Sequence, residues 1–114
     1  MPAVARKDKR DSVKSPHGAG PDCIGATTYK TDEGSDNVFV NGYGVVREGD
    51  KMEKHPKPGC ITHAPVLKSF SSKVYVNGKR LGRLGDAYIE AGNHVISSGS
   101  ENVSDGSSQT SAGK

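Results

Sequence analysis

The feature that most constrains the fold of this chain is a thirteen-residue segment that occurs twice, 36 residues apart. It reads VFVNGYGVVREGD at residues 38–50 and VYVNGKRLGRLGD at residues 74–86. Each copy has a β-branched and aromatic run, an Asn-Gly pair and a second short run that carries an arginine. Asn-Gly between such runs is typical of a β-hairpin, because a type I′ turn needs a positive φ at both central residues. The sequence therefore predicts two equivalent hairpins.

Partial copies of the same unit lie near both ends of the chain. PAVARKD at residues 2–8 resembles the second half of the unit, with Asp8 in the place of Asp50 and Asp86 but without the glycine before it. GSENV at residues 99–103 resembles GSDNV at residues 34–38, which begins the unit. Joined in space, the two halves would complete a third hairpin. This pattern predicts pseudo-threefold symmetry with the two ends close together.

The segments between the units, at 9–33, 51–70 and 87–98, are rich in Gly, Pro, Lys, Ser and Thr. They show no helical periodicity, so we expect them to be irregular within an all-β fold. Residues 1–106 are expected to form one domain, and the Ser/Gly-rich residues 107–114 a flexible tail.

The chain has little apolar material for a core. Val, Leu, Ile and Phe make up 20 of its 114 residues, and its net charge is only +3. A small domain with so thin a core usually needs a disulfide, a metal or a partner chain. Cys23 and Cys60 allow at most one disulfide; a metal role for Cys60 fits as well, whereas Cys23 is expected to be an ordinary buried thiol.

Targeting, membrane and nucleic-acid functions find little support in the sequence. The N-terminal MPAVARKDKR lacks the apolar region of a signal peptide, and no apolar run approaches the roughly 20 residues that span a bilayer. The excess positive charge lies in residues 6–14, where acids interrupt it and no aromatic residue accompanies it. Nucleic acid is therefore not an expected partner.

The histidines point to a metal site. All four lie in the segments between the hairpin units, and threefold-related segments would bring their imidazoles together at one end. Zinc is usually bound by four nitrogen or sulfur ligands, and Cys60-x-x-His63 has a spacing suited to chelation. The candidate ligands, of which four are expected to bind, are His17, His55, His63, His94 and Cys60.

Catalytic interpretations are weaker. A nucleophilic pair of Cys60 and His63 lacks a residue to orient it, and a zinc hydrolase needs an open coordination position. The repeat-equivalent Asp50 and Asp86 suggest a turn or capping role. Arg47 and Arg83 suggest a structural or surface role. No catalytic residue is therefore expected, and the protein is not expected to be an enzyme.

Taken together, PAVAR at residues 2–6, the repeated VNG…R-x-G-D pattern and the closing GSENV resemble the PAAR-repeat proteins, over roughly residues 2–106. The resemblance implies a small cone of short antiparallel β-hairpins with a metal at its vertex. Members of the family cap the trimeric spike of contractile injection machines, such as phage tail baseplates and type VI secretion systems. Their role is structural: the tip sharpens the spike that pierces a target membrane.

The resemblance also implies a ligand set. His55 and His63 match the ligands of the middle loop, and His17 with Gly18 matches an HG pair in the first loop. The last loop of the family commonly has a cysteine, whereas here His94 lies nearby. The site is thus either all-histidine, or Cys60 supplies a thiolate and one histidine does not bind. The expected metal is zinc, with iron as the second choice.

The implied partner is a trimeric β-helical spike protein, either a phage central spike or a valine-glycine repeat protein, with one tip per trimer. Contact with the target cell envelope would be transient. The implied location is a virion tail tip, or the bacterial cytoplasm before injection. An alternative role is an adaptor that attaches a separately encoded effector to the spike. The short polar tail favours a bare tip, because effector-bearing members carry long extensions.

Overall fold

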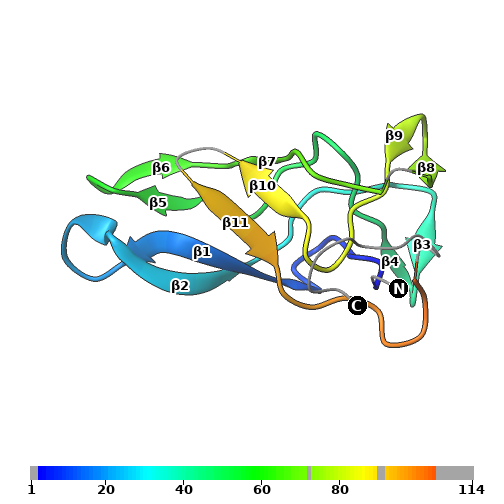
Figure 1. Ribbon diagram of the computed structural model, residues 1–114, viewed down its shortest axis with the longest axis horizontal. Helices are drawn as coiled ribbons and strands as arrows, with labels where there is room; N and C mark the ends of the chain where they lie inside the picture. Colours follow the sequence, from blue (N-terminus) through cyan, green and yellow to red (C-terminus); the bar gives the residue numbers. More distant parts are fainter. Residues whose placement is uncertain (1–2, 72, 90–91, 105–114) are drawn as a thin grey trace.

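The computed structural model describes residues 3–71, 73–89 and 92–104, and within them the protein is all-β (Figure 1). All strand pairs are antiparallel, and the only helical element is the 3₁₀ turn η1 (Pro21–Cys23) in the described residues. No helix in this part of the chain is long and apolar enough to cross a membrane. The strands are β1 (Ser12–Ala19), β2 (Gly25–Lys30), β3 (Phe39–Val40), β4 (Tyr43–Gly44), β5 (His55–Lys57), β6 (Ile61–His63), β7 (Val66–Leu67), β8 (Tyr75–Val76), β9 (Lys79–Arg80), β10 (Ala87–Ile89) and β11 (Asn93–Ile96).

The strands form one larger sheet and three separate hairpins. The larger sheet has the order β2-β1-β11-β10-β7, and the separate pairs are β3-β4, β5-β6 and β8-β9. The turns of β1–β2 and β5–β6 reach one end of the molecule, whereas β3–β4 and β8–β9 lie at the other (Figure 1). We call the first end the apex, with the β10–β11 hairpin included, and the second end the base.

The predicted pseudo-threefold symmetry is present in the backbone. The amide of Ala5 donates to the carbonyl of Gly82 (3.1 Å), Gly82 donates to Val46 (2.7 Å), and Val46 donates to Ala5 (3.0 Å). Three equivalent positions, one from each unit, thus close a ring of hydrogen bonds. The isolated β-bridges follow the same cycle: Val4 with Arg83, Arg6 with Val45, and Arg47 with Leu81.

The three predicted hairpins account for this symmetry. The turn residues Asn41 and Gly42 have φ values of 55° and 83°, as a type I′ turn requires, and the second copy repeats them at residues 77–78. The third unit is assembled from the two ends of the described chain: Ala3 forms a bridge with Ser104, and the amide of Val4 donates to the carbonyl of Val103 at 3.0 Å. The expectation that the ends lie close together is confirmed for residues 3–104.

Each unit also has an arginine–aspartate pair with a buried aspartate; Arg6 and Arg83 are buried too, whereas Arg47 is partly exposed. In every pair the backbone amide and Nε of the arginine donate to Oδ2 of the aspartate, at 2.7–2.9 Å. The pairs are Arg6–Asp11, Arg47–Asp50 and Arg83–Asp86. The predictions of structural roles for Arg47 and Arg83 and of turn roles for Asp50 and Asp86 agree with this arrangement.

The same pairs correct one detail of the repeat. Asp11, rather than Asp8, is the counterpart of Asp50 and Asp86. The first unit has two additional residues between its arginine and its aspartate, and the chain accommodates them with Asp8 and Lys9 in the left-handed region, at φ 60° and 64°. The sequence match to Asp8 lies three residues too early, because it implies a deletion in the first unit where the chain has an insertion.

The expectation that the segments between the units are irregular is wrong. They contain the longest strands, and they form the apex hairpins. The alternation of β1 was hidden because its buried face carries Val13, Ser15 and His17, two of which are polar. The predicted tail at 107–114 lies outside the described residues.

The core is small and divided into two clusters of buried apolar side chains. The larger cluster takes most of its members from strands of the larger sheet, and the smaller one includes side chains of the base hairpins. The larger cluster comprises Ala5, Val13, Val46, Met52, Leu67, Tyr88 and Ile96, and the smaller one Val4, Val45, Val76 and Leu81.

Candidate metal centre

The four histidines converge inside the apex. His17 comes from β1, His55 and His63 from the β5–β6 pair, and His94 from β11, so all three apex hairpins contribute. One ring nitrogen of each lies within 4.8 Å of the corresponding nitrogens of the others. Their residues are between 0% and 6% exposed, so the cluster is shielded from bulk water.

Strand register explains how these side chains meet. His55 and His63 are direct partners across the β5–β6 pair, and directly opposed residues present their side chains on the same face. His94 stands opposite Tyr88 in the β10–β11 pair. His17 follows Val13 and Ser15 on the buried face of β1, where side chains of alternate residues share one side.

Backbone carbonyls fix the orientation of three of the rings. Nδ1 of His17 lies 3.2 Å from the carbonyl oxygen of Pro56, Nδ1 of His55 lies 2.9 Å from that of Glu53, and Nδ1 of His94 lies 3.1 Å from that of Gly92. A carbonyl oxygen only accepts, so each Nδ1 carries the proton. The lone pair of a neutral ring is therefore on Nε2, which is how metal-binding histidines are usually oriented by their outer partners.

These lone pairs face one another. Nε2 of His55 lies 3.0 Å from Nε2 of His94 and 3.0 Å from Nε2 of His63, while the buried Nε2 of His17 has no hydrogen-bond partner within the described residues. Burial lowers the pKa of His55, and burial together with the charge of His55 lowers the pKa of His94 to about 4. The rings of His55 and His94 are thus neutral at pH 7, and a cation between them would relieve the contact of their Nε2 lone pairs.

The residues fit a metal ion. A tetrahedral site with metal–nitrogen distances of about 2.0–2.1 Å has nitrogen–nitrogen distances of about 3.3–3.4 Å. The two observed Nε2–Nε2 distances of 3.0 Å lie below that value, and all candidate ligand nitrogens lie within 4.8 Å of one another. Small side-chain movements would therefore bring the set to tetrahedral geometry. The buried group of His17, His55, His63 and His94 can hold a metal ion.

Two neighbours support this cluster: Tyr29, which the sequence did not reveal, and Gly18, which follows His17. The ring of Tyr29 stacks on His55, with centroids 4.3 Å apart and 22° between the planes. Gly18 has a φ of 115°, and a Cβ atom there would run into the hydroxyl of Tyr29. The glycine after His17 is thus required by backbone conformation and by space. The signal for Tyr29 is its place in an alternating run, residues 25–30, within a segment that the sequence predicted to be irregular.

The structure corrects the expectation for the cysteines. Cys23 and Cys60 form a disulfide, with their Cα atoms 5.3 Å apart. The sulfur of Cys60 is therefore bonded to carbon and sulfur and is not available as a thiolate, and Cys23 is not a free thiol. Of the two ligand sets that the sequence left open, the disulfide-bonded form offers the one composed of four histidines.

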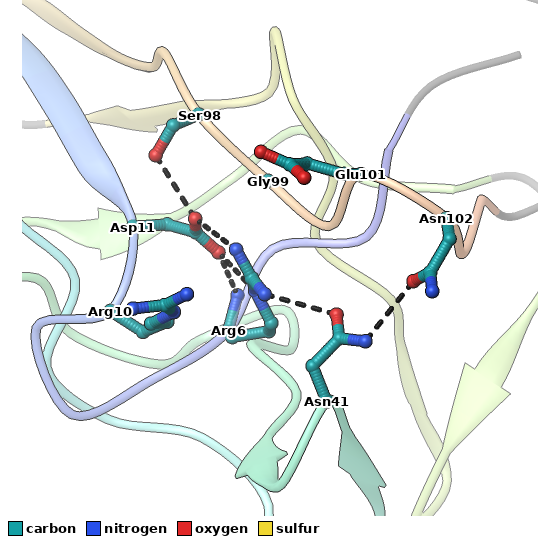
Figure 2. A pocket seen from close by; sticks show the side chains of 8 residues that line it. All are labelled: Arg6, Arg10, Asp11, Asn41, Ser98, Gly99, Glu101 and Asn102. Carbon is teal, nitrogen blue, oxygen red and sulfur yellow. Dashed lines mark hydrogen bonds and ion pairs between the residues drawn. The ribbon is translucent and has the colours of Figure 1, made fainter.

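A separate polar hollow lies beside the base, and it is poorly suited to catalysis (Figure 2). Its central guanidinium, that of Arg6, is already engaged by Asp11 and by Oδ1 of Asn41 at 3.0 Å. Asn41 in turn donates to Asn102 at 3.1 Å. Because these groups bond one another, the hollow belongs to the structural network of the base.

Comparison of the chain with protein-family models and with curated proteins found no match.

Proposed function

We propose that this protein is the tip of a contractile injection machine, either a phage tail or a type VI secretion system. The tip would cap a trimeric spike and sharpen it, with a bound metal ion at the apex. The observation that carries the proposal is the closed ring of hydrogen bonds through Ala5, Val46 and Gly82. A single chain that builds a threefold base is suited to a threefold partner, because each of the three partner chains then meets a similar surface.

The base has side chains to make that contact. Phe39 on β3 is 57% exposed and Tyr75 on β8 is 56% exposed, at repeat-equivalent positions. Val38 and Val103 are also exposed, so the apolar surface extends over all three units. Aromatic side chains are enriched where protein interfaces are buried. The proposed partner is a trimeric β-helical spike, with one tip per trimer.

The apex supports a structural metal rather than a catalytic one. Four imidazoles would fill a tetrahedral shell, and a substrate would have little access to side chains that are so deeply buried. Zinc fits four neutral nitrogen donors best, and iron is the second candidate. We propose that the metal stiffens the hairpins at the apex and that the protein is not an enzyme.

Docking is tested by mixing the protein with a trimeric β-helical spike fragment and measuring the mass of the complex by native mass spectrometry. We expect one tip per three spike chains. The double variant Phe39→Asp/Tyr75→Asp should lose the complex, whereas Ile61→Asp, which places a carboxylate on an exposed residue of the apex, should retain it. A complex that survives the base variant and fails with the apex variant would contradict the proposed orientation.

The metal is tested by elemental analysis of the purified protein. We expect about one equivalent of zinc in the wild type and in Thr62→Ala, an exposed neighbour, and less than half an equivalent in His63→Ala, because removing one ligand opens a tetrahedral shell. Absence of stoichiometric metal from the wild type, even after incubation with zinc, would remove the metal from the proposal and leave the docking experiment to stand alone.

A further inference from the structure

We propose that Cys23 and Cys60 form a redox-controlled crosslink that determines how long the apex retains its metal. This inference rests on the proposed metal site, and it adds a function for the two cysteines that the site itself does not use.

The crosslink joins two hairpin turns beyond the histidine cluster. Cys23 ends η1, which connects β1 to β2, and Cys60 follows the Pro58-Gly59 turn between β5 and β6. The amide of Gly59 also donates to the carbonyl of Asp22 at 2.9 Å, so the two turns are in direct contact. Figure 1 shows these hairpins reaching the same end of the molecule side by side.

The joined hairpins carry three of the four candidate ligands. His17 precedes Cys23 by six residues on β1, while His55 and His63 lie on either side of Cys60, five and three residues away. For the metal to leave, the hairpin with His17 must separate from the hairpin with His55 and His63. A covalent bond between their turns keeps a released imidazole close to the metal, so that rebinding competes with escape.

The pair is placed for exchange with solvent thiols. Cys60 is exposed, whereas Cys23 is 8% exposed, so an external reagent would meet Cys60 first. In the reduced form, the Cys60 thiolate would attack a small-molecule disulfide of the glutathione type and release one thiol. The Cys23 thiolate would then attack the Cys60 sulfur, and a second thiol would leave with the remaining proton. Two cysteine thiols are oxidised and one external disulfide is reduced; a dithiol reductant reverses both steps.

The backbone at both cysteines indicates a specific need for them. Cys23 has a φ of 57° and Cys60 a φ of 63°, a left-handed conformation in which glycine or asparagine is the usual choice. A cysteine at each of two such positions, facing each other across two turns, is explained by the bond between them.

The experiment follows transfer of zinc from the loaded protein to a chromophoric chelator. Four samples are compared: oxidised wild type, wild type reduced with a phosphine, and the Cys23→Ser/Cys60→Ser variant with and without the phosphine. We expect reduction or substitution to speed zinc loss by at least about tenfold, the size of effect that groups orienting metal ligands commonly have. The phosphine should not change the rate of the double variant. Circular dichroism of each zinc-loaded sample checks that the fold is retained, and reduced wild type provides the same test without a mutation.

Equal rates in the oxidised and reduced wild type would overturn the crosslink proposal while leaving the metal site intact. Slower loss from reduced wild type than from the double variant would also overturn it, because the thiols would then act as ligands. Failure of every sample to bind zinc would overturn the metal site and the crosslink proposal together.

Discussion

The base of this protein is built from the three repeated units and the apex from the segments between them, and only the base keeps the threefold symmetry in detail. At the base each unit repeats the same interactions, down to a buried serine whose Oγ accepts from two amides two and three residues further along, at Ser35, Ser71 and Ser100. At the apex the units diverge: one hairpin supplies two histidines and the others one each, and the disulfide joins only two of them.

The difference follows from what each end has to match. A tetrahedral ion needs four ligands, and three equivalent hairpins can supply only multiples of three. One hairpin must therefore differ, and the β5–β6 pair does so by placing His55 opposite His63. The base has no such requirement. Its regularity is what a threefold partner would need, whereas the irregularity of the apex is what a single metal would need.

Breaking one of the arginine–aspartate pairs at the base gives the largest expected loss of stability. Asp86 is 3% exposed and accepts three hydrogen bonds from Arg83. In Asp86→Asn the guanidinium stays buried without its counter-charge, so we expect a loss of about 3–5 kcal/mol in the free energy of unfolding. Urea denaturation of the zinc-loaded protein measures it.

The repeat supplies both a replicate and a control for this variant. Asp50→Asn removes the equivalent carboxylate from Arg47, with the same hydrogen-bond geometry. Because the Arg47 side chain is 17% exposed, the cost should be somewhat smaller than for Asp86→Asn. Asp36→Asn removes an ion pair with Lys7, but the Asp36 side chain is 96% exposed, so little or no change is expected. Equal effects at Asp86 and Asp36 would contradict the structural role assigned to the buried pairs.

Acid should act on the apex of the metal-free protein before it acts on the base. The pKa of His94 is lowered to about 4 in the folded protein, from about 6.5 when unfolded, and the pKa of His55 is lowered as well, in both cases mainly by burial. The unfolded chain therefore binds more protons below pH 6.5, and stability falls as the pH falls. Arg6 and Arg47 at the base remain charged, because the hydrogen bonds that they donate to Asp11 and Asp50 raise their pKa values.

From pH 7 to pH 5, His94 alone should remove about 2 kcal/mol from the free energy of unfolding. Urea denaturation across this range, with a chelator present, measures the loss. The variant His94→Gln, which cannot titrate, should show a shallower dependence than the wild type. A profile that is flat in the wild type, or unchanged in the variant, would show that His94 does not titrate in this way.

The sequence predicted the base better than the apex, for a physical reason. Asn-Gly turns and β-branched runs are local signals, and a repeat states the same signal twice, so the hairpins and their symmetry could be read directly. The first unit was harder to align with the other two. In the sequence, an insertion between Arg6 and Asp11 cannot be distinguished from a deletion before Asp8. Only the hydrogen bonds of Arg6 identify its partner.

At the apex the sequence indicated the histidines but neither the strands that carry them nor the disulfide. The buried face of β1 is partly polar because it carries Ser15 and His17, so the hydrophobic alternation that marks a strand is absent. The pairing of Cys23 with Cys60 depends on two turns meeting in space, which no local pattern records. Strands are hardest to predict from sequence where their buried residues are polar side chains of a site rather than apolar side chains of the core.

The smallest expected effect lies where base and apex meet. Tyr88 on β10 follows Asp86 by two residues and stands opposite His94, and it is 0% exposed within the larger apolar cluster. Its hydroxyl has no hydrogen-bond partner in the described part of the chain. Burial raises the pKa of Tyr88, and the nearby carboxylates of Asp50 and Asp11 raise it further.

The carboxylates of Asp50 and Asp11 already accept hydrogen bonds from Arg47 and Arg6. An unpaired buried hydroxyl costs about 1–3 kcal/mol, so Tyr88→Phe, which keeps the ring and removes the oxygen, should raise the free energy of unfolding by about 1 kcal/mol. Urea denaturation measures the gain, and Tyr75→Phe, an exposed change of the same kind, should have almost none. A loss of stability in Tyr88→Phe would mean that the hydroxyl has a partner after all, and that the junction is held by a polar contact rather than by packing alone.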